Sequence, residues 1–144
     1  MKVLIVDDSV VFRMAISTGL ANVPGIETVG VVSNGQIAVE FLKKTKSVDL
    51  MILDMEMPIM NGIETIKAVR EFNRKIVIIV FSSLTLNGAE LTLQALDLGA
   101  NDFVTKQEAS SAINLASSLK MIEATLVPKI NAFEKVLKIG KHKE

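Results

Sequence analysis

Five apolar runs along this 144-residue chain alternate with stretches in which apolar residues recur every three or four positions. Three of the runs are nearly continuous in Val, Ile, Leu and Met, which is typical of parallel strands buried on both faces. The alternation predicts an α/β fold, in which helices cover both sides of a five-stranded parallel sheet. We expect the strands near residues 2–6, 27–32, 49–53, 76–81 and 101–105.

The stretches between the runs carry the start and stop signals of helices. Asn34 is a predicted N-cap, and Asn61 belongs to a turn that precedes the third helix. Asn87 and Gly88 are expected to open the fourth helix, and Gly99 to end it. The first helix shows the clearest stripe of residues facing a core, at Phe12, Ala15, Ile16, Gly19 and Leu20.

The C-terminal part of the chain carries an extended helical stripe that Pro128 interrupts. Proline inside a helix removes a hydrogen bond and clashes with the preceding turn, so we expect a kink or break near Val127. Since five helices would already cover the sheet, the stripe after the proline should have no core left to join. We therefore expect a core domain over residues 1–125 and a helical linker over residues 126–144, of which the part from Pro128 onward should be dispensable for folding but needed to reach a partner domain. The stripe after the proline consists of Ile130, Phe133 and Leu137.

The composition argues against several classes of protein. The chain has no cysteine, so thiol nucleophiles and thiolate metal sites are impossible. No apolar run is long enough to span a bilayer, and the amino terminus has carboxylates where a secretion signal needs a longer apolar core. We therefore expect a cytoplasmic protein without membrane insertion. Sixteen basic and sixteen acidic side chains leave no net charge, which argues against binding to nucleic acid.

Polar side chains follow four of the apolar runs, at the points where the predicted strands end. Asp7 and Asp8 follow the first run, Asp54 the third, Ser82 the fourth and Lys106 the fifth. Taken singly, each has an ordinary explanation as a helix cap, a loop carboxylate or a surface lysine. The carboxyl ends of parallel strands share one edge of a sheet, where open α/β sheets bind ligands, so we expect these side chains to converge. Together they suit a divalent cation and a phosphoryl group.

A Mg²⁺ site would explain the crowding of carboxylates at this edge. Close carboxylates repel one another unless a cation lies among them, and Mg²⁺ takes carboxylate, water and phosphate oxygens as ligands. One of Asp7 and Asp8, together with Asp54, can supply side-chain ligands, and the backbone carbonyl of Glu56 is a further candidate. The second carboxylate oxygen of Asp54 can then attack phosphorus, as carboxylates do in aspartyl-phosphate chemistry.

Phosphoryl chemistry also fits the remaining polar groups. Lys106 and the metal would neutralise charge on the phosphoryl oxygens, and Ser82 can donate a hydrogen bond to another of these oxygens. The one histidine of the chain, His142, lies in the charged tail, so neither a Ser/His/Asp triad nor a histidine-bound zinc site can be assembled. The sequence also lacks the glycine-rich loops of nucleotide-binding proteins.

Three motifs give the chain its resemblance to a response-regulator receiver domain, over residues 1 to about 125. The motifs are Val-Asp-Asp-Ser at 6–9, Leu-Asp-Met-Glu-Met-Pro-Ile-Met-Asn-Gly at 53–62 and Gly-Ala-Asn-Asp-Phe-Val-Thr-Lys at 99–106. The resemblance implies a flavodoxin-like, doubly wound sheet with strand order 2-1-3-4-5 and an extended C-terminal helix. It also implies two-component signalling, with a histidine kinase as phosphodonor.

The same resemblance gives each polar residue a role. Asp54 is implied as the phosphoacceptor and Asp8 as the direct Mg²⁺ ligand, with Asp7 acting behind it in the metal site. The roles implied for the remaining residues are phosphoryl contact for Lys106 and switching for Ser82 and Phe103.

The chain departs from the family at two positions. Gln107 follows Lys106 where the family usually has proline, often after a cis bond. A cis bond before glutamine costs about 2.5–4 kcal/mol, so we expect Lys106 to be less well positioned. Phe103 lacks the hydroxyl of the tyrosine found in many relatives, so its switching can involve packing but no hydrogen bond.

The loop after the fourth predicted strand narrows the resemblance. Residues 82–85, residues 90–100 and Glu56 are similar to the receiver of the chemotaxis protein-glutamate methylesterase. This implies a regulatory chain without turnover, whose output partner is a methylesterase-type domain absent from this sequence. Alternatives are a stand-alone chemotaxis-type regulator, a structural pseudo-receiver and a phosphohydrolase of the haloacid-dehalogenase type, which would want an aspartate in place of Glu56.

Overall fold

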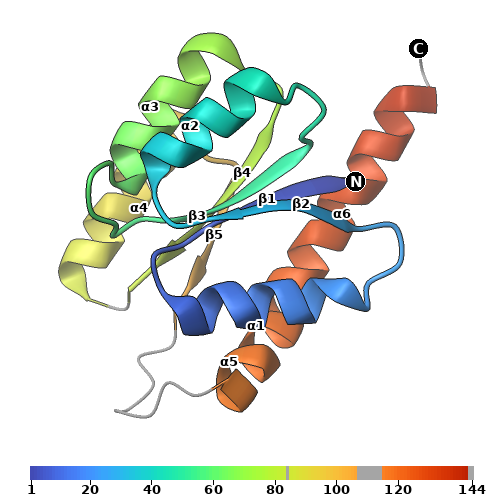
Figure 1. The fold of residues 1–144 in the computed structure, drawn as a ribbon, viewed down its shortest axis with the longest axis horizontal. Helices are drawn as coiled ribbons and strands as arrows, with labels where there is room; N and C mark the ends of the chain where they lie inside the picture. The colour runs from blue at the N-terminus through green and yellow to red at the C-terminus, as the bar shows by residue number, and fades with distance from the viewer. Residues whose placement is uncertain (84, 107–114, 143–144) are drawn as a thin grey trace.

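The apolar runs form the strands of one parallel sheet in the computed structural model, which describes residues 1–83, 85–106 and 115–142 (Figure 1). The strand order is β2-β1-β3-β4-β5, and the strand positions and the flavodoxin-like order are as predicted. The strands are β1 (Lys2–Val6), β2 (Glu27–Val32), β3 (Leu50–Asp54), β4 (Val77–Ser82) and β5 (Asp102–Thr105).

Helices cover both faces of this sheet and enclose two apolar cores (Figure 1). All residues of β3 and β4 are buried, which explains why their sequences are apolar without alternation. One face carries α2 (Gly35–Lys44), α3 (Gly62–Phe72) and α4 (Leu86–Leu98), and the other carries α1 (Val10–Ala21), α5 (Leu115–Met121) and α6 (Val127–His142). None of the described helices is long and apolar enough to cross a bilayer.

Strand register brings the carboxyl ends of the strands level with one another. Asp54, the last residue of β3, is the register partner of Phe81 on β4, and Ser82 is the partner of Thr105 on β5. The backbone N–H of Lys106 donates to the carbonyl of Ser82 at 2.7 Å, which extends this pairing by one residue. The polar residues that follow the strands therefore start from one edge of the sheet.

Side-chain caps set the helix boundaries, with one departure from prediction. Asn34 caps α2, and Gly99 ends α4 with φ of 121°, both as expected. The expectation that Asn87 and Gly88 open α4 is wrong, because the helix begins at Leu86. The hydroxyl of Thr85 accepts a hydrogen bond from the Gly88 N–H at 3.0 Å, so the cap forms two residues before Asn87.

The loop from β3 to α3 holds a strained turn. Ile59 has φ of 70°, a conformation that is rare for a β-branched residue. The Met60 N–H donates to the Pro58 carbonyl at 2.8 Å, which closes a three-residue turn around Ile59. Ile59 is 74% exposed, so packing of its side chain contributes little free energy to offset the strain.

We predict that Ile59→Asn raises the free energy of unfolding by about 1 kcal/mol, because asparagine tolerates positive φ. Ile59→Val is the matched control, since valine keeps the β-branch and therefore the strain. Urea unfolding of both variants measures the difference. Equal stability of the two variants would contradict the assignment of strain to this turn.

The C-terminal helical region contains a π-helical turn, Ile122–Leu126, between α5 and α6. The Val127 N–H donates to the carbonyl of Ile122, five residues back. The predicted irregularity near Val127 is therefore present, but as a widened turn rather than a break. Because the widened turn shifts the hydrogen-bond pattern just before Pro128, the helix continues through a residue that has no N–H to donate.

The expectation that the stripe beyond Pro128 has no core left to join is wrong. Ile130 is completely buried, and Phe133 packs beside it against the core formed with α1 and the sheet. Met1 and Ile26, at the amino end of the sheet, pack against the same core. The expectation that five helices would cover the sheet did not account for this apolar surface, which the first turns of α6 cover.

We predict that Ile130→Ala lowers the free energy of unfolding by about 2–5 kcal/mol, because it leaves a cavity in a packed core. The same deletion at Val136, which lies on α6 and is 63% exposed, should change the stability by less than about 0.5 kcal/mol. Urea unfolding measures both values. A near-neutral Ile130→Ala would restore the view that α6 lies outside the folded core.

Candidate functional site

Three carboxylates meet at the carboxyl edge of the sheet. The carboxylate oxygens of Asp7, Asp8 and Asp54 lie within 4.8 Å of one another. Asp7 is completely buried and Asp54 is 5% exposed, whereas Asp8 is exposed. The ends of β1 and β3, which are neighbours in the sheet, supply these residues. The predicted convergence of the three side chains is confirmed.

Lys106 brings a positive charge to this cluster. Its Nζ atom lies 3.0 Å from Asp7 Oδ2 and 3.5 Å from Asp54 Oδ1. One ammonium faces three carboxylates, so the cluster keeps an excess of negative charge when all groups are ionised. A backbone hydrogen bond also orients the Asp7 carboxylate, because the Ser9 N–H donates to Asp7 Oδ1 at 2.8 Å.

The pKa of Asp54 is raised from its ordinary value of 3.8 to about 7, chiefly by burial and next by the negative charge of Asp7, whereas Lys106 opposes the shift. The Glu56 N–H donates to Asp54 Oδ1 at 3.3 Å, which also favours the ionised form. Without further positive charge, Asp54 is therefore partly protonated near neutral pH. A cation beside it would favour the carboxylate, which is the form that can act as a nucleophile.

The donor set fits a hard divalent cation such as Mg²⁺. All the candidate ligands are oxygens, and the exposed Asp8 leaves room for water in the coordination shell. Asp7 Oδ2 is buried and accepts no hydrogen bond within the described part of the chain, its contact with Lys106 being an ion pair. A buried carboxylate oxygen in this position is compensated by nearby positive charge.

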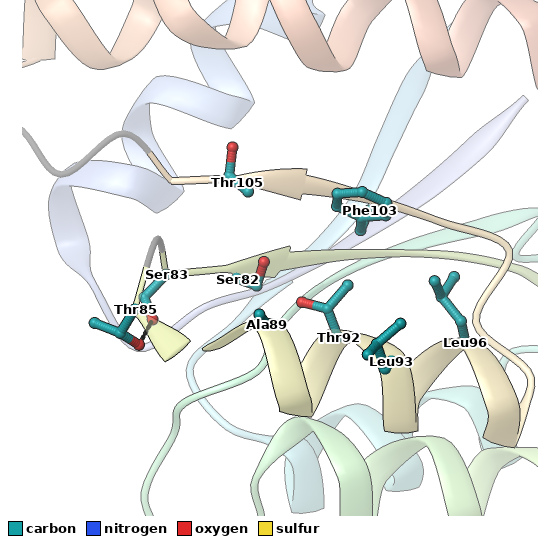
Figure 2. A pocket seen from close by; sticks show the side chains of 9 residues that line it. All are labelled: Ser82, Ser83, Thr85, Ala89, Thr92, Leu93, Leu96, Phe103 and Thr105. Carbon is teal, nitrogen blue, oxygen red and sulfur yellow. Dashed lines mark hydrogen bonds between the residues drawn. The ribbon is translucent and has the colours of Figure 1, made fainter. Parts of the chain in front are cut away.

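Ser82 and Phe103 border a cavity (Figure 2). The cavity measures about 320 Å³ and lies between the ends of β4 and β5 and the helix α4. Ser82 is 3% exposed and Phe103 is 38% exposed, so the aromatic ring is partly open to solvent. The other lining residues are Ser83, Thr85, Ala89, Thr92, Leu93, Leu96 and Thr105.

Two contacts near the site were not predicted from the sequence. Lys106 Nζ lies 4.2 Å from the centroid of the Phe12 ring, although the sequence pattern assigned Phe12 only to the core stripe of α1. Lys129 of α6 pairs with Asp102 at 2.9 Å and lies 5.5 Å from the Phe103 ring centroid. The position of Phe12, four residues after Asp8 in the first predicted helical turn, is the sequence feature that could have indicated its closeness to the site.

The expectation about Gln107 lies outside the described residues, which end at Lys106 on this side and resume at Leu115. The role of the Glu56 carbonyl as a metal ligand stays a prediction. So do the individual roles of Asp54, Asp8 and Lys106 in phosphoryl chemistry, because geometry alone places these groups together without assigning a reaction to them.

Comparison with known proteins identifies the family. The response regulator receiver domain matches residues 3–118. A solved structure of the response regulator domain of Thermotoga maritima CheB has a TM-score of 0.78 and 35% identity, covering 92% of this chain and 94% of that one. The REC domain of AraT, a response regulator from Geobacillus stearothermophilus, has a TM-score of 0.68 and 25% identity, covering 92% and 97%. The chain belongs to the response regulator receiver domain family.

Within that family, the chain is similar to proteins named protein-glutamate methylesterase/protein-glutamine glutaminase. The one from Desulfotalea psychrophila is 43% identical over 129 residues, which cover 87% of this chain and 35% of the relative. The one from Trichodesmium erythraeum is 44% identical over 135 residues, with 92% and 37% covered. The chain thus spans about a third of the length of these curated relatives.

We predict that the contribution of Asp54 to the stability of the metal-free protein falls as pH rises from 3.8, the ordinary pKa of Asp54, to about 7, its pKa in the folded state. In this window the folded chain keeps a proton that the unfolded chain releases, so the free energy of unfolding decreases with pH. Asp54→Asn removes this contribution and should be the more stable protein above about pH 7.

Urea unfolding in the presence of a chelator, across this pH window, measures the effect. Asp49→Asn, at the opposite end of the same strand, is the control and should keep the wild-type slope. Adding Mg²⁺ above about pH 7 should stabilise the wild type more than Asp54→Asn, because the metal binds the folded acidic cluster. Parallel pH profiles for wild type and Asp54→Asn would contradict the prediction.

Proposed function

We propose that this chain is a phosphorylation-controlled regulatory domain in which Asp54 accepts a phosphoryl group from a histidine kinase. The observation that carries the proposal is the buried Asp54 carboxylate, which lies in one cluster with Asp7, Asp8 and Lys106. A purely structural carboxylate gains nothing from two further carboxylates at this distance, since they repel it. The grouping is useful when a cation and a phosphoryl group bind among these side chains.

In the transfer step, an Asp54 carboxylate oxygen forms a bond to phosphorus. The bond between phosphorus and the donor atom breaks, and its electron pair leaves with the donor, which is a histidine nitrogen of the kinase or the acetate oxygen of acetyl phosphate. Lys106 would balance charge on the phosphoryl oxygens, a role supported by the 3.5 Å distance between its ammonium and Asp54 Oδ1. Mg²⁺ held by Asp8, Asp54 and the Glu56 carbonyl would supply Lewis-acid stabilisation of the same oxygens.

Ser82 and Phe103 are proposed as the residues that pass this change to the surface. The cavity beside Phe103 offers space into which the ring can move when Ser82 contacts a phosphoryl oxygen. Lys129 contacts both the Phe103 ring and Asp102, so a shift of the ring would alter the contacts of α6 as well. The response would then reach the C-terminal helix.

The output is proposed to be a methylesterase-type domain beyond the residues described. This rests on the names of the relatives and on the third of their length that the chain covers. In that arrangement residues 126–144 connect the receiver to the output domain, with their first turns anchored through Ile130. The protein would act in the cytoplasm in chemotaxis signalling, and the residues present would have a regulatory role without turnover.

We predict that acetyl phosphate with Mg²⁺ adds one phosphoryl group to the protein, at Asp54. Intact-mass measurement should show a single adduct that is absent in Asp54→Asn and absent when a chelator removes the metal. Asp49→Asn, which removes a carboxylate at the amino end of the same strand, should still give the adduct. An adduct that persists in Asp54→Asn would place the acceptor elsewhere.

A further inference from the structure

The ammonium of Lys106 rests on an aromatic ring that the chemistry above does not use. Lys106 Nζ lies 4.2 Å from the Phe12 ring centroid, in addition to its contacts with Asp7 and Asp54. The face of an aromatic ring is electrostatically negative and attracts a cation within about 6 Å of its centroid, most strongly where water is excluded. The Lys106 side chain is only 19% exposed, so the interaction takes place in a largely dry site.

Phe12 is fixed by a hydrogen bond of its backbone and by packing of its ring. Phe12 is 4% exposed, and its N–H donates to the Ser9 hydroxyl that caps α1. Its ring packs against Phe81, with centroids 6.3 Å apart and an interplanar angle of 50°. Phe81 is completely buried and is the register partner of Asp54. The ring therefore has a fixed place relative to the carboxylate.

We propose that Phe12 is a positioning residue, which holds the Lys106 ammonium in the orientation needed to meet the phosphoryl group on Asp54. The inference rests on the proposed function of Asp54. Lys106 follows β5, whereas Phe12 belongs to α1, so the ring restrains the ammonium independently of the backbone that carries it. Two carboxylates attract the ammonium, and the ring gives it a third contact that carries no full charge and so leaves the ammonium available to the phosphoryl oxygens.

The competing explanation is that Phe12 only fills space between α1 and the sheet, where it belongs to the apolar core. Filling space requires volume, whereas holding an ammonium requires the negative face of the ring. Fluorine substitution separates the two properties, because fluorine withdraws electron density from the ring face while changing its size little.

The test replaces Phe12 with mono-, di- and trifluorophenylalanine in the full chain. The measured quantity is the rate constant for phosphorylation of Asp54 by acetyl phosphate at saturating Mg²⁺, and thermal melting verifies that each variant is folded. The rate constant should fall stepwise with fluorination, by about threefold to thirtyfold in total. A rate constant that does not change across the series, in a wild type that is phosphorylated, would overturn the proposal.

Two controls assign the effect to the contact with Lys106. The same substitutions at Phe41, a half-buried residue of α2 that packs against the other core, should leave the rate constant unchanged. In a Lys106→Met background the dependence on fluorination at Phe12 should disappear. An equal fall in that background would mean that the ring acts through packing, which also overturns the proposal.

A measurement without phosphorylation distinguishes failure of this proposal from failure of the proposed function. In a double-mutant cycle of Phe12→Leu and Lys106→Met, followed by urea unfolding, the two changes should be coupled by about threefold or more in the folding equilibrium constant. Additive changes would overturn the proposed contact whether or not Asp54 is phosphorylated. A coupled pair in a protein that takes no adduct at Asp54 would overturn both the proposed function and the role of Phe12 in it.

Discussion

The excess of negative charge around the buried Asp54 carboxylate is the constraint on which the rest of the structure depends. Asp7 and Asp8 can approach Asp54 only because β1 and β3 are neighbours whose ends are level. Lys106 reaches the same point because β5 ends beside β4 and its N–H continues the pairing to Ser82. The ends of β1, β3 and β5 thus bring three carboxylates and one ammonium together, and a divalent cation would offset the excess of negative charge.

Much of the fold could be predicted, because continuous apolar runs such as residues 76–81 have few structural alternatives at their length. The opening of α4 could not be predicted as reliably, since Thr85 and the Asn87–Gly88 pair both carry cap signals and only the backbone path decides between them. The C-terminal helix was misjudged for a different reason. Burial of Ile130 depends on apolar surface left open at the amino end of the sheet, which local sequence patterns do not reveal.

The acidic residues of the site were predictable because a parallel sheet sends every strand end to the same edge. Asp7 and Lys106 directly follow strands and Asp54 is the last residue of one, so their meeting required only the correct topology. Phe12 was missed because it lies on a helix, where one residue can belong to the apolar stripe and still present a ring face to a charged group. An apolar stripe predicts that a side chain is buried, but it does not predict which charged group contacts the face of its ring.

The π-helical turn between α5 and α6 also sets the rotational phase of the last helix. An α-helix has 3.6 residues per turn, so residues spaced by four are rotated by about 40° about the helix axis at each step. Ile122, Leu126 and Ile130 have this spacing. A turn closed five residues apart takes up more chain and reduces this drift, so all three side chains stay on the buried side. One residue more or fewer in this turn would rotate α6 about its axis, and the face that it presents to solvent would change while the sheet stayed the same.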